Sequence, residues 1–137
     1  MPKLIMTTGL PGSGKSTWAD TVLRESTPGS VVRVNKDLLR KMLHADVHAK
    51  GTEKQIIAAR DSICRMFLRQ GVDVIVDDTN LAAFHEESLR NIALQCQADF
   101  EVKDFRDVDV ELCIQRDARR VATVGEKIIQ DMKAKYL

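Results

Sequence analysis

Short apolar runs alternate with longer amphipathic stretches along the whole chain. The apolar runs, bounded by polar or turn-forming residues, predict strands at Leu4–Thr8, Val31–Val34, Val72–Val76 and Phe100–Phe105. The stretches between them predict helices after Lys15, from about Asp37, at Thr52–Gln70, at Phe84–Gln97, and after Asp109 and Gly125. This alternation indicates an α/β fold, in which a central parallel sheet of about four to five strands is flanked by helices.

Helical spacing within these stretches marks one side of each helix as apolar. In the longest stretch Ile56, Ile63 and Phe67 fall on one stripe, and Leu89 and Ile92 repeat the pattern in the following helix. These side chains are therefore expected to pack in the core and to carry no chemistry.

The chain length and charge limit the classes of function. With 137 residues, the chain fits a single domain spanning residues 1–137. Its 21 basic and 20 acidic residues give a formal net charge of +1, so no overall attraction to nucleic acid or membrane is expected. A polyanion would have to be held by a local cluster of charges.

Cysteine usage and the apolar runs indicate the compartment. Cys64, Cys96 and Cys113 are odd in number and far apart, which suits reduced thiols better than a disulfide framework. No apolar run approaches the ~20 residues that cross a bilayer. The first strand begins too early to leave room for a removable signal. We expect a cytoplasmic protein, in the host cytoplasm if a phage encodes it, without membrane contact.

The residues between the first strand and the first helix spell G-x-x-x-x-G-K-S at Gly9–Ser16. This phosphate-binding loop lies in the strand–loop–helix context that the motif requires. Lys15 supplies a cation toward the β- and γ-phosphates, and the Ser16 hydroxyl is suited to bind Mg²⁺. The residues expected to contact ATP or another nucleoside triphosphate are Gly12, Ser13, Gly14, Lys15, Ser16 and Thr17.

Asp37 follows the second strand, where open parallel sheets bind their ligands. A carboxylate there can orient an acceptor hydroxyl and take its proton, which makes Asp37 the candidate general base. An equally good interpretation is that Asp37 caps the helix that follows. Arg40 lies on the same helical face, and its planar guanidinium suits a phosphate on the acceptor.

Asp77 and Asp78 follow the third predicted strand, which is apolar enough to be central. A carboxylate at this place can hold the Ser16 hydroxyl or a water bound to Mg²⁺. Successive side chains point to opposite faces of a strand, so one of the two is expected to reach the metal. The sequence favours Asp78, although a solvated turn is the alternative.

Three arginines lie near the end of a helix in the last third of the chain. Arg116 and Arg120 are four residues apart and share a helical face, which would let both clamp phosphates. Cations at a helix C-terminus also complement its dipole, and both roles are compatible. Arg119 is the alternative to Arg120 if the register differs by one. The region is expected to form a C-terminal lid.

Four segments carry a resemblance to a known family. They are Gly-Leu-Pro-Gly-Ser-Gly-Lys-Ser-Thr-Trp-Ala at 9–19, Asn-Lys-Asp-Leu-Leu-Arg at 35–40, Asp-Thr-Asn-Leu at 78–81 and Arg-Asp-Ala-Arg-Arg at 116–120. Together they resemble the kinase domain of the phage T4 type polynucleotide 5′-kinases, a branch of the P-loop phosphotransferases.

The resemblance implies ATP-dependent phosphorylation of the 5′-hydroxyl end of DNA or RNA with Mg²⁺. It implies that Asp37 activates the hydroxyl, Arg40 holds the acceptor's 3′-phosphate and Arg120 acts on the transferring phosphate. Lys15, Asp37 and Arg120 are thus the expected catalytic residues, with Ser16 and Asp78 at the metal. The acceptor contacts expected on this basis are Asp37, Arg40, Thr79 and Val124.

Two other functions remain compatible with the sequence. The first is a P-loop kinase of a small molecule such as a nucleoside, nucleotide or sugar, which the modest net charge permits. The second is a P-loop ATPase or nucleotide-gated binding module, in which Asp37 and Arg40 would be structural. The sequence does not predict the oligomeric state.

Overall fold

Four parallel strands form one sheet in the order β2-β3-β1-β4. The strands of the computed structural model, which describes residues 1–137, are β1 (Lys3–Thr8), β2 (Val31–Val34), β3 (Asp73–Val76) and β4 (Asp99–Asp104). Because β1 pairs with both β3 and β4, the phosphate-binding loop leaves the sheet between two neighbours. The loop therefore lies beside the segment that follows β3.

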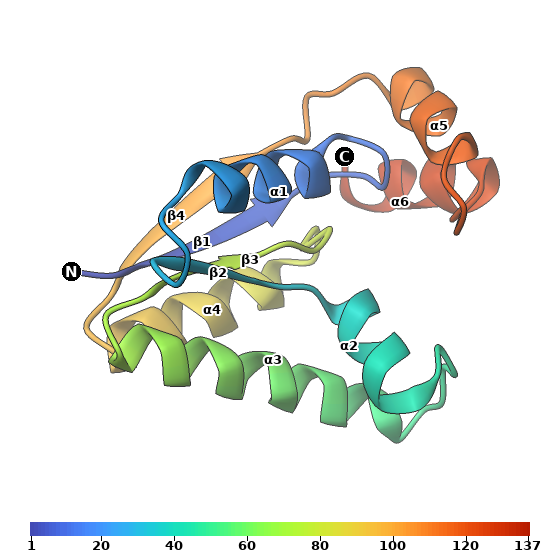
Figure 1. Ribbon diagram of the computed structural model, residues 1–137. Coiled ribbons are helices and arrows are strands. Elements are labelled where there is room, and N and C mark those ends of the chain that lie inside the picture. Colours follow the sequence, from blue (N-terminus) through green and yellow to red (C-terminus); the bar gives the residue numbers. More distant parts are fainter.

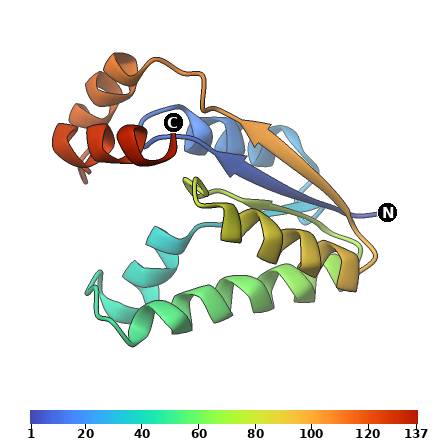
Figure 2. The same cartoon turned by 180° about the vertical axis from the view of Figure 1, so that it is seen from behind.

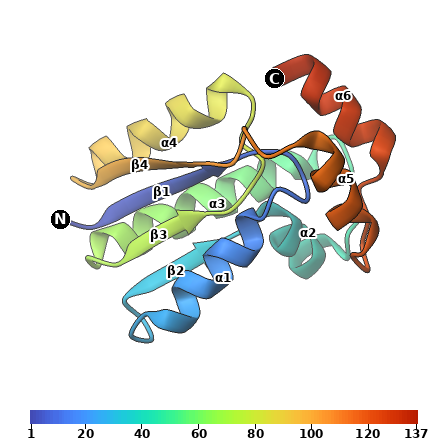
Figure 3. The ribbon, with the colours of Figure 1, turned by 90° about the horizontal axis from the view of Figure 1, so that it is seen from above.

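Six helices surround this sheet (Figure 1). They are α1 (Lys15–Glu25), α2 (Lys36–His44), α3 (Thr52–Arg69), α4 (Ala83–Gln95), α5 (Val110–Ala118) and α6 (Glu126–Tyr136). Helix α1 covers one face, and α3 and α4 cover the other, as the view from behind shows (Figure 2). Helices α2, α5 and α6 lie beyond the carboxyl ends of the strands (Figure 3). No helix is long and apolar enough to cross a membrane.

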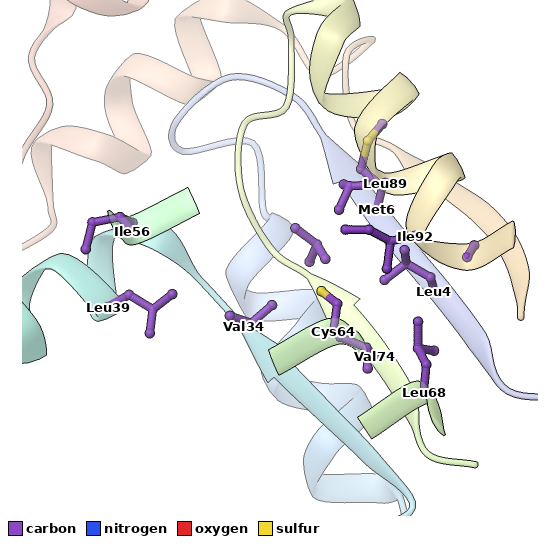
Figure 4. Packing of buried hydrophobic residues seen from close by; sticks show 12 residues of the cluster. Leu4, Met6, Val34, Leu39, Ile56, Cys64, Leu68, Val74, Leu89 and Ile92 are labelled. Atoms are coloured by element: carbon purple, nitrogen blue, oxygen red, sulfur yellow. The ribbon is translucent and has the colours of Figure 1, made fainter. Parts of the chain in front are cut away.

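The main core lies between the sheet and the α3–α4 layer (Figure 4). Strand β3 is buried on both faces, and Val74, Ile75 and Val76 have no exposed surface, as expected for the centre of a parallel sheet. Leu68 from α3 and Leu89 from α4 pack against it. Each fully buried aliphatic side chain contributes roughly 1.5–3 kcal/mol. This core fixes the carboxyl end of β3, on which the site depends.

A second apolar cluster joins the phosphate-binding loop to the C-terminal helices. Leu10 of the loop packs with Cys113 of α5 and Ile129 of α6, and all three are buried. Gly12 has a positive φ of 81°, and a Cβ at this position would overlap the backbone carbonyl oxygen of Cys113. Helix α5 therefore sits directly on the loop because a glycine leaves room for it.

The predicted elements are all present, with boundaries that differ by one or two residues. Strand β4 covers Asp99–Asp104, one residue earlier than predicted, and α4 ends at Gln95 because its chain turns through Gln97, which has a positive φ. The fold class predicted from the sequence, a parallel α/β sheet flanked by helices, is confirmed with four strands.

Candidate active site

The phosphate-binding loop connects β1 to α1. Gly14 occupies the position before α1 with a φ of 101°, and no side chain caps the first amides of that helix. Uncapped amides at a helix start, together with the positive end of the helix dipole, form a site for an anion. The Gly9 amide donates to the Thr79 carbonyl at 3.0 Å, which ties the loop to the segment after β3.

Lys15 lies inside this loop rather than in solvent. Its Nζ donates to the Leu10 carbonyl at 2.6 Å and to the Ser13 hydroxyl at 3.2 Å. Burial lowers the pKa of Lys15 to about 8, although the negative charge of Asp77 works against this shift. The ammonium has three donors, so one remains for a phosphate oxygen without moving the side chain.

Asp77 is the first residue after β3, and its side chain is 1% exposed. Neither carboxylate oxygen has a hydrogen-bond partner. Burial raises its pKa, while the Ser16 hydroxyl, Arg33 and Lys15 counteract that rise. Its nearest cation is Arg33, whose Nε lies 3.7 Å from Oδ2. An unsatisfied buried carboxylate facing Ser16 is a suitable ligand, directly or through water, for a divalent cation.

Asp78 is hydrogen-bonded to the helix that follows β2. Its Oδ1 accepts a hydrogen bond from the Lys36 amide at 2.9 Å, at the start of α2. Burial raises the pKa of Asp78, and the bond from the Lys36 amide opposes the rise. Asp78 thus anchors α2 through Oδ1, while its Oδ2 has no hydrogen-bond partner. The contact of Asp77 with Ser16 favours Asp77 at the metal, and Asp78 stays the prediction from the sequence. The two neighbours point in opposite directions, as their strand-end position predicts.

The segment after β3 is fixed to the end of β1. The Thr7 hydroxyl donates to the Asp78 carbonyl at 2.9 Å, and the Thr8 hydroxyl donates to the Asn80 carbonyl at 3.2 Å. Asn80 has a positive φ of 44°, and its side-chain Nδ2 donates to the Thr7 carbonyl. Thr79 between them is half-buried, and its carbonyl holds Gly9. The predicted acceptor contact Thr79 thus lies beside the loop.

Asn35, not Asp37, caps α2. The Asn35 Oδ1 accepts a hydrogen bond from the Leu38 amide at 2.9 Å, and its Nδ2 donates to the Asp77 carbonyl. Asp37 sits in the first turn with its side chain 80% exposed. The alternative that Asp37 serves as the helix cap is therefore wrong. Its carboxylate remains available to an acceptor, and its charge reaches Asp77, whose pKa it raises.

Arg40 does not present a free guanidinium. Its side chain is 8% exposed, and Nε and Nη2 donate to the two oxygens of Glu53 at 2.7 and 2.8 Å. A third bond runs from Nη1 to Asp37 Oδ1 at 2.7 Å. These bonds raise the pKa of Arg40 and lower that of Glu53. The arginine assigned from the sequence to an acceptor phosphate thus holds Asp37 and is itself held by Glu53, and its contact with an acceptor stays a prediction.

The predicted lid consists of α5, α6 and the loop at 119–125 between them. The Asp117 carboxylate is buried and accepts hydrogen bonds from the amides of Val124, at 3.0 and 3.1 Å, and Gly125, at 2.9 Å. Arg120 Nη1 lies 3.4 Å from Asp117 Oδ1. Asp117 lies within the segment 116–120 that carries the resemblance, but no role was expected for it from the sequence. Its carboxylate sets the path of the loop that carries Arg120.

The lid arginines are exposed and differ in their surroundings. Arg116 Nη1 lies 3.6 Å from the place that a Cβ on Gly14 would occupy, so it lies over the phosphate-binding loop. The charge of Arg120 lowers the pKa of Lys15, which places it within electrostatic reach of the loop. Arg120 also forms an ion pair with Asp117, whereas Arg119 forms none. The structure therefore favours Arg120 over Arg119 as the arginine that accompanies Arg116.

These residues fit a magnesium–nucleoside triphosphate complex. The uncapped start of α1 and Lys15 suit the phosphates, and the buried carboxylate of Asp77 beside Ser16 suits the cation. When bound, Mg²⁺ neutralises charge on the phosphates of the donor. Helix α2, which carries Asp37, and helices α5 and α6, which enclose the loop of Arg120, lie at this same end of the sheet (Figure 3).

Known proteins with similar sequences and structures are kinases or RNA repair proteins. L-seryl-tRNA(Sec) kinase of Methanococcus maripaludis is 27% identical over 135 residues, which are 97% of this chain and 52% of that protein. A chain of the Pnkp1/Rnl/Hen1 RNA repair complex is 30% identical with a TM-score of 0.80, over 98% of this chain and 44% of that one. The APS kinase of Mycobacterium tuberculosis is 26% identical with a TM-score of 0.54, over 79% of each chain.

The present chain thus spans about half the length of the tRNA kinase and less than half of the RNA repair chain. The family model AAA_33, described as an AAA domain, matches residues 4–137. With the phosphate-binding loop, the parallel sheet and these relatives together, the chain is a P-loop kinase domain that belongs to the AAA_33 family.

Proposed function

We propose that residues 1–137 form one kinase domain that transfers the γ-phosphate of ATP to the 5′-hydroxyl end of a polynucleotide. The observation that carries this proposal is the exposed carboxylate of Asp37, held by Arg40 at 2.7 Å. One carboxylate oxygen of Asp37 is bonded to Arg40, and the other is open. Such a base suits an acceptor that is too large for a closed pocket, such as the 5′ end of a polynucleotide.

The transfer follows from the placement of the charged groups. Asp37 accepts the proton of the acceptor hydroxyl as its oxygen bonds to the γ-phosphorus, and the bond to the bridging oxygen of ADP breaks. Lys15 and Arg120 stabilise the charge on the phosphoryl group during transfer. Base catalysis of this kind contributes typically ~10²- to 10⁴-fold to the rate.

Two relatives support a nucleic acid as the acceptor. One is a kinase of an aminoacylated tRNA, and the other is a chain from an RNA repair complex. Both align with nearly the whole of this chain. The resemblance to the phage T4 type kinases indicates that the phosphorylated group is a 5′-hydroxyl.

A small-molecule acceptor is the second candidate, and a specific likeness favours it. The APS kinase structure shares 26% identity with this chain over 79% of its length. A net charge of +1 is also unremarkable for an enzyme of a small metabolite. The two candidates share the loop chemistry and differ in the acceptor that Asp37 activates.

The deciding experiment is transfer of label from γ-labelled ATP with Mg²⁺ to a panel of acceptors. The panel contains 5′-hydroxyl RNA and DNA oligonucleotides, their 5′-phosphorylated forms, seryl-tRNA, adenosine 5′-phosphosulfate, nucleosides, sugars and water. We expect label on the 5′-hydroxyl oligonucleotides and none on their 5′-phosphorylated forms. Label on a small metabolite alone would establish the second candidate, and free phosphate alone would indicate an ATPase.

Asp37→Asn tests the role of the base in the same assay. The variant should lose ~10²- to 10⁴-fold in kcat while the KM for ATP is unchanged. Asp46→Asn is the matched control, because Asp46 lies just beyond α2, is exposed and forms no ion pair. Equal activity of the two variants would remove Asp37 from the mechanism.

A further inference from the structure

An exposed aromatic pair lies at the start of α4, directly after the segment that follows β3. The rings of Phe84 and His85 stack with centroids 4.0 Å apart and planes inclined by 36°. Phe84 is 59% exposed, whereas the other phenylalanines of the chain are at least partly covered. An exposed ring gains little from folding, so packing of the core does not explain its presence here.

His85 is held in place from beneath. Arg60 is 1% exposed, and its Nη1 lies 3.4 Å from His85 Nδ1. Arg60 is itself fixed by a bond from Nε to Asp61 Oδ1 at 3.0 Å. Burial and the charges of Lys36 and Arg60 lower the pKa of His85 to about 4. At neutral pH the imidazole is therefore uncharged, and its Nδ1 can accept a hydrogen bond from Arg60.

The surroundings of the pair carry charges of both signs, because buried Arg60 is paired with Asp61 and the acidic residues Glu86 and Glu87 follow His85 on α4. Lys36 and Arg60 both act on His85, and Lys36 immediately precedes Asp37 in α2. The start of α4 and the start of α2 lie at the same end of the sheet as the phosphate-binding loop (Figure 3). An exposed aromatic ring at this end of the sheet matches the stacking platforms with which proteins bind single-stranded nucleic acids.

We propose that Phe84, supported by His85, is a stacking site for a nucleobase near the 5′-hydroxyl end of the acceptor strand. The proposal rests on the proposed function and adds to it that the strand end is unpaired. Base stacking tolerates any sequence because every base has a flat face. The start of α4 lies at the end of the sheet that carries the phosphate-binding loop, which is where the acceptor strand of the proposed function would end (Figure 3).

The test compares Phe84→Ala, Phe84→Tyr and a control, Leu94→Ala. Leu94 is also an exposed apolar residue of α4 but lies at the far end of the helix. The acceptors are short 5′-hydroxyl RNA oligonucleotides, each with one abasic nucleotide at a different position near the 5′ end, and the fully based parent. KM and kcat are measured for each acceptor and for ATP.

Phe84→Ala should raise the KM for the parent oligonucleotide roughly 5- to 100-fold, with the KM for ATP unchanged. One abasic acceptor should remove this difference between variant and wild type, because the stacked base is then missing. Phe84→Tyr should restore the parent KM, and Leu94→Ala should behave as wild type. A 2-aminopurine at the same position should lose fluorescence on binding to wild type but not to Phe84→Ala.

Three results would overturn the inference. If Phe84→Ala leaves the KM for every oligonucleotide unchanged while wild type phosphorylates them, the stacking site is wrong and the proposed function stands. If the loss is the same for all abasic acceptors, Phe84 does not contact a particular base. If wild type labels no oligonucleotide, the proposed function fails and the stacking site fails with it.

Discussion

The guanidinium of Arg40 donates to both carboxylate oxygens of Glu53, at 2.7 and 2.8 Å, and so joins α2 to the first turn of α3. The remaining bond from Arg40 holds Asp37. The exposed carboxylate proposed as the base therefore takes its position from Glu53, a residue on another helix. Arg40 thus links the position of Asp37 on α2 to that of Glu53 on α3.

Glu53→Gln should lower the free energy of unfolding by about 1–2 kcal/mol. Arg40 is largely buried and would lose a charged partner, which lowers stability. Glu53 is partly exposed, so solvent screening keeps the loss of stability below that measured for fully buried ion pairs. Urea denaturation measures the change. Glu87→Gln is the control, since Glu87 is exposed on α4 and forms no ion pair.

The same variant should change how stability depends on pH. Arg40 holds the pKa of Glu53 below its ordinary value of 4.5, so the pair stabilises the fold above that pH. As the pH falls below 4.5 and Glu53 takes up a proton, this stabilisation is lost. The difference between wild type and Glu53→Gln should therefore shrink in acid, and a constant difference would contradict the pairing.

Asp77→Asn should raise the concentration of Mg²⁺ needed for half-maximal activity by about 10- to 100-fold. Its carboxylate is buried and close to Ser16, and its only ion pair is the long contact of 3.7 Å with Arg33, so the amide would remove the charge that attracts the cation. Asp78→Asn is the matched comparison, because its Oδ1 can still accept the Lys36 amide. Activity measured against Mg²⁺ concentration separates the two. A larger shift for Asp78→Asn would support the sequence-based choice.

The sequence predicted the sheet because its central strands are continuous apolar runs. Val74–Val76 can be buried on both faces in a parallel sheet, and the pattern allows little else. The phosphate-binding loop was equally predictable, because its chemistry depends on adjacent backbone atoms and residues. Local patterns thus fixed the fold class and the part of the site that binds the nucleotide.

Contacts between distant elements were not predictable in the same way. The choice between Asp77 and Asp78 depends on where β3 ends, and a shift by one residue reverses the direction of a side chain. Glu53 is separated from Arg40 by a turn, and no motif connects them. Asp117 looks like an ordinary helical residue until its bond to the Val124 amide is seen.

ATP affinity should fall above about pH 8 because Lys15 then loses its proton. Burial lowers the pKa of Lys15 to about 8, so its ammonium is present below that pH and lost above it. Since phosphate favours the charged form, binding should take up a proton, and affinity should drop by up to about tenfold per pH unit. Calorimetry in buffers of different ionisation enthalpy measures both effects. Lys15→Arg, which stays charged, should flatten the profile.

Asp117→Ala should lower the free energy of unfolding by about 1–3 kcal/mol. It leaves the amides of Val124 and Gly125 without a partner at the start of α6. Hydrogen exchange should show faster exchange of the 119–125 loop, and kcat should fall because Arg120 is carried by that loop. Asp131→Ala, an exposed residue paired with Lys127 on α6, should change stability by no more than about 0.5 kcal/mol.

Arg120→Ala should lower kcat by about 10³-fold or more, within the range found for arginines that act on a transferring phosphate. The charge of Arg120 acts on Lys15, and of the two adjacent lid arginines Arg120 is the one that forms an ion pair with Asp117. Arg119→Ala should therefore cost less than about tenfold, and it serves as the matched control because both side chains are exposed. Single-turnover kinetics with saturating ATP isolates the transfer step. If Arg119→Ala showed the larger loss, the loop held by Asp117 would have to turn Arg120 outward during transfer.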